Sequence, residues 1–420
     1  MKALRIVPES LGTASLGTVI LKRTEITSLE VDVRLLPKTV IDVHEEERIR
    51  GNLSECLFRH LSQCQPGAQA SDTLFTRLTL KDVDLTTCKH TWFTFINLRN
   101  LEHLSLEHCI SPDDFLVKIA SSVYTPALET FTLLHQTTGE GDKTMDAVED
   151  LLRHPTQTLR KLMLSIREAS KLPAVNALRA HRYTLEVLQL DILPSMGTIV
   201  DMSPTARESD VESRLHYDCE DLARLVGDLP AIKELAIGLP RVNLLYGDLA
   251  GENEDFAGSV DLIASCRRLT RLNILNWPIG YVIVQRPGYA AATAPQVART
   301  AAYVFGRHRQ YSLMQDDFLS HDTVGDPTLK IVAFGVNHHA TLSPEPAYFV
   351  QSKVHALGKT TFSAQAVELA ELRKFGSRSD ILEHPKRDFN ERSRRSFSRN
   401  VRSRPHSPGS EGSHHGGWER

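Results

Sequence analysis

Apolar residues recur along this chain with a fixed short spacing. An apolar residue is followed three positions later by a second and two positions after that by a third, as in Leu101, Leu104 and Leu106. The second and third enclose one polar position, an alternation that is typical of a half-buried β-strand. Five successive copies start at residues 75, 101, 128, 159 and 185, so neighbouring copies are 26 to 31 residues apart. Such regularity predicts a repeat protein.

The predicted strands extend over most of the sequence, and insertions separate the copies outside the regular run. Three apolar residues define each copy, and the last copy is the weakest match. The copies are Met1, Leu4, Ile6; Ile26, Leu29, Val31; Phe75, Leu78, Leu80; Leu101, Leu104, Leu106; Leu128, Phe131, Leu133; Leu159, Leu162, Leu164; Leu185, Leu188, Leu190; Ile232, Leu235, Ile237; Leu269, Leu272, Ile274; and Leu329, Val332, Phe334.

Segments with helical spacing fall between the predicted strands. After Leu106 the chain continues through Ser111 and Pro112 into apolar residues that recur at helical spacing. Ser111 is predicted to be the N-cap, Pro112 suits the first turn, and Asp114 completes a capping-box pattern. Further helical stripes consist of Ile49, Leu53, Leu57, Leu61 and Cys64; Met145, Val148, Leu151 and Leu152; Cys219, Leu222, Leu225 and Val226; and Asp261, Leu262, Ile263 and Cys266.

One strand and one helix form a unit that is too thin to bury its own hydrophobic face, so neighbouring units must stack. We therefore predict an α/β fold, a curved solenoid with parallel strands on the concave face and helices on the convex face. The expected organisation is an irregular repeat solenoid over residues 1–345, a C-terminal capping segment over 346–372 and a disordered, basic, Ser/Arg-rich tail over 373–420.

The stretch LEHLSLEHC resembles the cysteine-containing leucine-rich repeat, L-x-x-L-x-L-x-x-C, with Cys109 in the cysteine position and Asp114 near the expected acidic position. The irregular repeat lengths and the stretches LKIVAFGV and AYFVQSKV are similar to those of fungal F-box-associated leucine-rich-repeat proteins. The resemblance covers roughly residues 1–370. It implies a leucine-rich-repeat horseshoe that acts as substrate receptor of a cullin-type ubiquitin ligase.

The chain departs from that family because no F-box is recognisable. The nearest candidate, residues 35–64, starts with Leu-Pro but lies between two repeat strands, so we interpret it as the convex helix of an early repeat. A strand at residues 1–6 would also start the array without a capping element. We therefore expect further sequence upstream, and an adaptor of the ligase would bind only if an F-box lies there.

Composition and motifs give no indication of catalysis. The six cysteines form no C-x-x-C pair, so neither a zinc site nor a disulfide framework is predicted. The stretch GTASLGTV has phosphate-loop spacing but carries Thr18 where a lysine is needed. His338-His339 and His414-His415 are adjacent pairs, unlike an i, i+4 metal pair. We expect no enzyme activity, cofactor, metal or membrane contact, and a location in the cytoplasm, the nucleus or both.

The charge is unevenly distributed along the chain, whose net charge is −3. Residues 373–420 carry 12 Lys and Arg against 6 Asp and Glu, and they include the pairs Arg392-Ser393, Arg395-Ser396 and Arg402-Ser403. These pairs are similar to short segments of RNA-associated proteins. The alternative function is therefore that of an RNA-associated or nuclear protein that acts through this tail. The competing interpretation is that the tail is inert and only increases solubility.

The leading hypothesis is a non-catalytic module that binds a protein partner on the concave face. Side chains alternate along a strand, so the residues flanking the inner apolar positions point away from the core. Their charges are mixed, which favours a protein over a polyanion as the partner. The predicted partner-binding residues are Arg77, Thr79, Lys81, His103, Ser105, Glu107, Thr130, Thr132, Lys161, Met163, Ser165, Gln189, Asp191, Glu234, Arg271 and Asn273.

Overall fold

One open sheet organises the chain in the computed structural model. Among the described residues twelve strands pair in the order of the sequence. The model describes residues 2–6, 26–32, 52, 54, 76–86, 98–122, 126–135, 140–154, 158–194, 214–242, 253–278, 290–316, 328–335, 346–356, 359–372 and 379–382. The strands are β1 (Lys2–Ile6), β2 (Ile26–Asp32), β3 (Arg77–Lys81), β4 (His103–Glu107), β5 (Thr130–His135), β6 (Lys161–Arg167), β7 (Val187–Leu193), β8 (Glu234–Ile237), β9 (Arg271–Ile274), β10 (Ile331–Phe334), β11 (Ala347–Ala356) and β12 (Lys359–Val367).

The predicted strands are confirmed, because the last two apolar residues of every copy lie in a strand. Strands β1 to β10 are parallel, and equivalent repeat positions face each other. Leu104 pairs with Leu78 on one side and with Phe131 on the other. The chain therefore repeats one register from strand to strand, and two rows of buried apolar side chains, those of Leu104 and of Leu106, cross strands β2 to β10.

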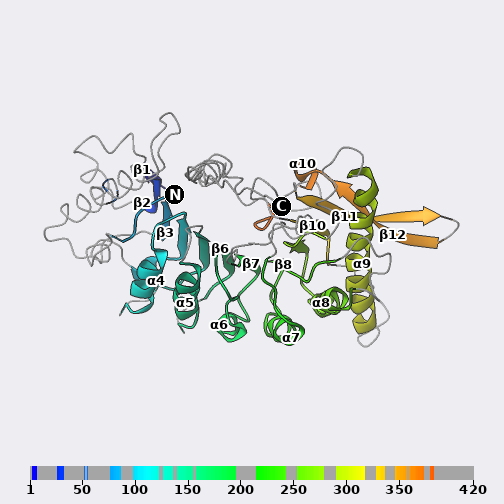
Figure 1. Ribbon diagram of the computed structural model, residues 1–420, viewed down its shortest axis with the longest axis horizontal. Coiled ribbons are helices and arrows are strands. Elements are labelled where there is room, and N and C mark those ends of the chain that lie inside the picture. Colours follow the sequence, from blue (N-terminus) through cyan, green and yellow to red (C-terminus); the bar gives the residue numbers. More distant parts are fainter. Residues whose placement is uncertain are drawn as a thin grey trace, which may run out of the picture.

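The helices from α4 (Pro112–Ala120) to α9 (Ala290–Asp316) form a row along one face of the sheet (Figure 1). Each of α4 to α9 contacts the next, and the hydrophobic core fills the space between this row and the sheet. Among the described helices, none combines the length and the apolar character that a bilayer crossing requires. The helices are α4 (Pro112–Ala120), α5 (Gly141–Leu152), α6 (Val175–Arg179), α7 (Cys219–Asp228), α8 (Glu254–Ala264), α9 (Ala290–Asp316) and α10 (Leu369–Leu372), with a short 3₁₀ helix η3 (Leu98–Asn100) before β4.

A left-handed residue follows several strands directly. Asp82, His108 and Glu168 have φ of 56°, 58° and 57° and come immediately after β3, β4 and β6. This conformation costs roughly 1 kcal/mol or more for a residue other than glycine. Asp82 and His108 occupy equivalent repeat positions, and Glu168 lies two positions further on in its repeat, so a left-handed bend recurs at the ends of these strands.

Cys109 follows one of these bends and lies in the core. It is buried, and its thiol donates to the carbonyl of Leu80 in the preceding strand, with Sγ and O 3.4 Å apart. Val83, at the matching place one repeat earlier, is also buried. The backbone of Ile110 donates to the carbonyl of Val83 at 3.0 Å, so the loops pair as the strands do.

The predicted cap of α4 is wrong in its chemistry although the helix starts where expected. Pro112 occupies the first turn, but Ser111 has φ 48° and makes no side-chain capping hydrogen bond. A capping side chain reaches the first free N–H groups from an extended backbone, which Ser111 lacks. Asp113 and Asp114 instead place negative charge at the helix N-terminus, where the helix dipole favours it.

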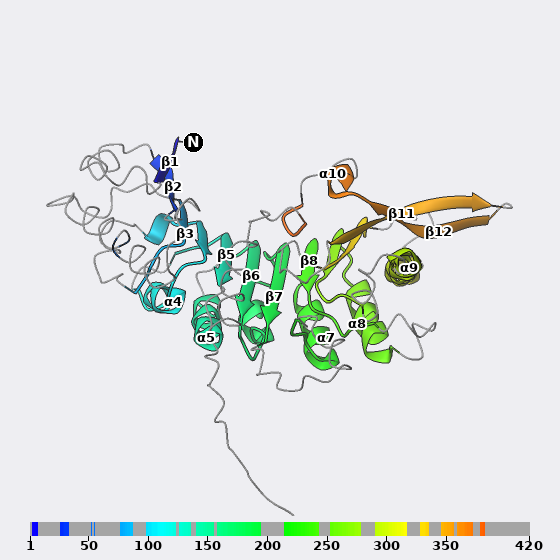
Figure 2. The same ribbon diagram turned by 45° about the horizontal axis from the view of Figure 1, so that its top comes forward.

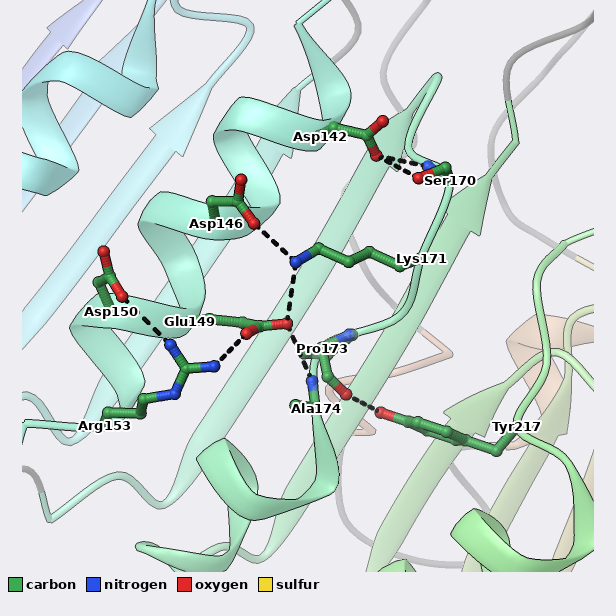
Figure 3. A network of polar contacts seen from close by, with 10 residues as sticks. All are labelled: Asp142, Asp146, Glu149, Asp150, Arg153, Ser170, Lys171, Pro173, Ala174 and Tyr217. Atoms are coloured by element: carbon green, nitrogen blue, oxygen red, sulfur yellow. Dashed lines mark hydrogen bonds and ion pairs between the residues drawn. The ribbon is translucent and has the colours of Figure 1, made fainter.

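Polar contacts on the helix side join successive repeats (Figure 3). Glu149 of α5 accepts a hydrogen bond from the backbone N–H of Ala174 at the start of α6, at 3.1 Å, and forms an ion pair with Lys171. The hydroxyl of Tyr217 donates to the carbonyl of Pro173 at 2.6 Å. These contacts, together with the apolar core, fix the position of each helix relative to the next.

The sheet ends in a hairpin. Strand β11 pairs antiparallel with β10, and β12 pairs antiparallel with β11. The rings of Phe334 and Phe349 pack edge to face with their centroids 6.1 Å apart, which continues the core into the hairpin. Residues 346–372 therefore contain the two last strands of the sheet and α10.

Candidate functional site

The face of the sheet opposite the helix row presents polar side chains at β3 to β5. In these strands the core-facing residues are buried and alternate with residues that are exposed or half-buried. The register places Thr79, Ser105 and Thr132 side by side. We call this region the open surface, and it consists of Arg77, Thr79, Lys81, His103, Ser105, Thr130 and Thr132.

Charges on the open surface are largely balanced locally. The Nζ atom of Lys81 lies 2.7 Å from a carboxylate oxygen of Glu30 and 3.7 Å from one of Glu107. Ser105 donates to Glu107 at 3.2 Å, and Glu107 is itself buried. Burial and, to a smaller extent, the charge of Arg77 lower the pKa of His103 below 6.5, so its ring is neutral at pH 7. A partner therefore meets donors and acceptors with little net charge.

The rest of the predicted partner-binding face differs from the expectation. Lys161 and Arg271 are half-buried. The other predicted residues of β6 to β9 do not form an accessible surface, because further parts of the chain cover this side of the sheet. The buried ones are Met163, Ser165, Gln189, Asp191, Glu234 and Asn273.

Asp191 has a structural role instead. One carboxylate oxygen lies 3.1 Å from the guanidinium of Arg214, and the other accepts from Ser165 at 3.0 Å. Both charged side chains are only 2% exposed. Asn276 holds the backbone of Arg214 from both sides, since it accepts from the N–H at 2.7 Å and donates to the C=O at 3.1 Å. This network holds the segment before α7 in place.

A short segment near the C-terminus covers Glu234. We call residues Ser379–Leu382 the C-terminal turn, and it lies on the side of the sheet opposite the helix row (Figure 2). Its Ser379 hydroxyl and its Asp380 and Ile381 N–H groups all donate to one oxygen of Glu234, at 3.0, 3.0 and 3.3 Å. Four residues of the segment that was expected to be disordered thus have a defined place, and the rest of 373–420 lies outside the described residues.

Beneath the C-terminal turn the sheet is apolar. Ile381 is 2% and Leu382 0% exposed, and both pack with Leu372 of α10. The side chains that receive them are called the apolar floor, and they lie on or directly after strands β8 to β11. The apolar floor consists of Ala236, Leu275, Ile331, Ala333, Tyr348 and Val350.

Burial shifts the pKa of several titratable groups in the described core. Burial raises the pKa of Cys109 and of Cys266 to about 12, so both thiols are protonated at neutral pH. Burial lowers the pKa of His135 to about 4, against a smaller opposite effect of Asp113. In the part of the chain that the structure describes, no three His, Cys, Asp or Glu side chains gather as metal ligands would. The phosphate-loop-like stretch at Gly12 and the two histidine pairs lie outside the described residues.

The sequence pattern therefore located the open surface but missed the C-terminal turn and the Asp191–Arg214 pair. Both depend on contacts between residues far apart in the chain, for which short-range spacing carries no signal. The adjacent aliphatic residues Ile381 and Leu382, in a segment otherwise rich in Ser and Arg, are the one local sign of the turn. Comparison of the chain with models of known protein families finds no match, and comparison with curated proteins finds none either.

Proposed function

We propose that this chain is a leucine-rich-repeat solenoid that binds a protein partner through the open surface of β3 to β5. The repeated register and the recurring left-handed residue after the strand support stacked repeats of one kind. Neighbouring strands are about 4.8 Å apart, whereas packed helices need about 8 to 10 Å. The helix side is therefore the longer one, and the open surface lies on the concave side.

The single observation that carries the proposal is the aligned polar rows of the open surface. The second row, parallel to that of Thr79, Ser105 and Thr132, contains Arg77, His103 and Thr130. Their hydroxyl, imidazole and guanidinium groups present donors and acceptors at the strand spacing on a rigid sheet. Such surfaces suit a folded partner, because little side-chain entropy is lost when short side chains on strands are buried.

A protein partner fits the charge pattern better than a nucleic acid. A polyanion is held by lysine and arginine side chains that neutralise phosphates. Lys81, at the end of β3, already lies between Glu30 and Glu107. The narrower role, substrate receptor of a cullin-type ubiquitin ligase, rests on the sequence resemblance alone.

Partner capture by the full chain tests the proposal. A photo-crosslinking residue at Ser105 would identify the proteins that contact the open surface, and Arg77→Glu with Thr132→Arg should abolish their capture. Lys143→Glu, an exposed charge reversal on α5, is the matched control and should leave capture intact. All chains should unfold at the same temperature. Equal capture by the surface variant and the control would overturn the proposal.

A further inference from the structure

The C-terminal turn contacts the sheet as a bound peptide would. Its backbone N–H groups at Asp380 and Ile381 point at one carboxylate oxygen of Glu234. The hydroxyl of Ser379 donates to the same oxygen and accepts from the N–H of Leu382 at 3.2 Å, which closes the turn. Two of the three donors to the Glu234 carboxylate are backbone N–H groups, so the turn is held mainly through its backbone.

The side chains of the turn match two different parts of the sheet. Asp380 forms an ion pair with Lys161 of β6, with Nζ and Oδ1 2.7 Å apart. Ile381 and Leu382 pack onto the apolar floor. On the sheet side Arg271 pairs with Glu234 and so orients its carboxylate. The contact therefore selects a serine or threonine, then an acidic residue, then two aliphatic residues.

Two buried polar groups beside the apolar floor are not used by the turn. Gln189 and Asn273 are the register neighbours of Ala236 on either side, and Asn273 is also the neighbour of Ala333. Each is 4% exposed, and within the part of the chain that the structure describes neither Gln189 Oε1 nor Asn273 Oδ1 has a hydrogen-bond partner. Buried acceptors are normally satisfied, so these two mark a place where a longer ligand has donors to offer.

We propose that the concave face over β6 to β11 is a peptide-binding site that the chain's own C-terminal turn occupies. The ligand class is a segment with a Ser/Thr, Asp/Glu, aliphatic, aliphatic sequence, and a partner that carries one displaces the turn. The inference rests on the proposed function in one respect, since it takes the concave side as the side where partners bind. It concerns a different surface, because the open surface lies on β3 to β5.

A peptide of residues 376–385, GSRSDILEHP, tests the site directly. The receptor is the full chain with Ile381→Ser and Leu382→Ser, which we call the vacated chain, and binding is measured by fluorescence anisotropy. A tethered segment acts at an effective concentration on the order of millimolar. The peptide should therefore bind the vacated chain at least about tenfold more tightly than the wild-type chain.

A charge swap controls for non-specific binding. The peptide with Asp380→Lys should bind at least about tenfold more weakly, because its lysine meets Lys161 with the same charge. The vacated chain with Lys161→Glu should recover that binding. If the vacated chain does not fold, the full chain with Asp380→Lys, a substitution at a half-exposed position, is the second receptor and should bind the wild-type peptide.

Absence of peptide binding to a folded receptor, or binding that the charge swap does not affect, would overturn the proposal and leave the turn as a structural element. Failure of the proposed function has a different signature. In that case Arg77→Glu with Thr132→Arg leaves capture unchanged, whatever the peptide does. A chain that binds the peptide yet captures no protein through the open surface would keep the peptide site and refute the proposed function.

Discussion

Glu234 and Ser379 lie 145 positions apart in the chain, and their side-chain oxygens are 3.0 Å apart. This hydrogen bond joins β8 to the C-terminal turn, which follows α10 in the described part of the chain. It belongs to a contact of four residues on the sheet face opposite the helix row, and the open surface of β3 to β5 lies outside this contact. A contact this small can open without unfolding the sheet.

Removing the acceptor should release the turn. In Glu234→Ala the N–H groups of Asp380 and Ile381 lose their partner and Arg271 loses its counter-ion, so hydrogen exchange at both amides should become faster. The free energy of unfolding should fall by about 2 to 4 kcal/mol. Lys161→Ala is the control, since its exposed ion pair with Asp380 contributes about 1 kcal/mol or less. Unchanged exchange in Glu234→Ala would show that the carboxylate does not hold the turn.

The buried pair of Asp191 and Arg214 makes a separate prediction about stability. Arg214→Met leaves the carboxylate buried without its main counter-ion, and this should cost about 3 to 5 kcal/mol in chemical denaturation. Replacing both partners by apolar residues, Asp191→Leu with Arg214→Met, should be less harmful than the single change, because no unpaired charge remains. A loss of less than about 1 kcal/mol in Arg214→Met, or a double variant less stable than this single one, would contradict the prediction.

Local spacing predicts the strands because it reports which side chains must face a core. Leu104 and Leu106 are buried in the strand that their spacing predicts, as are their counterparts in β2 to β10. The cap at Ser111 failed because the backbone bends there into the left-handed region, a choice set by packing around the strand end rather than by the serine itself.

The candidate site was predictable only where nothing else in the chain covers the sheet. Thr79 and Gln189 occupy the same position in their repeats, yet the first is half-exposed and the second buried. The later strands also make long-range contacts on this face, such as Asp191 with Arg214 and Glu234 with Ser379, and a repeat pattern contains no information about them. Long-range contacts therefore decide which half of a uniform face is available to a partner.

The described cysteines should differ in their rate of alkylation, because their exposure to solvent differs. With a pKa of about 12, Cys109 and Cys266 are ionised at pH 8 in about one molecule in ten thousand, and burial of Cys109 also blocks access to its thiol. Iodoacetamide should therefore modify the exposed Cys219 in the native chain and spare the other two, as peptide mapping would show. In denaturant all three should react, which is the control. Rapid native labelling of Cys109 would mean that the bend after β4 opens readily.

His135 makes the stability of the sheet depend on pH. Burial lowers its pKa from 6.5 to about 4 in the folded chain, so between these values the unfolded chain binds more protons. The free energy of unfolding should therefore decrease as the pH falls from 6.5 to 4, by up to about 3 kcal/mol from this residue. His308, whose pKa burial also lowers, likewise reduces the free energy of unfolding as the pH falls.

Urea titrations at several pH values would measure the free energy of unfolding of the wild-type chain and of His135→Asn, whose side chain cannot take up a proton. In this range the free energy of unfolding of the variant should depend less steeply on pH. Parallel slopes would mean that the ring at position 135 is accessible to protons in the folded state.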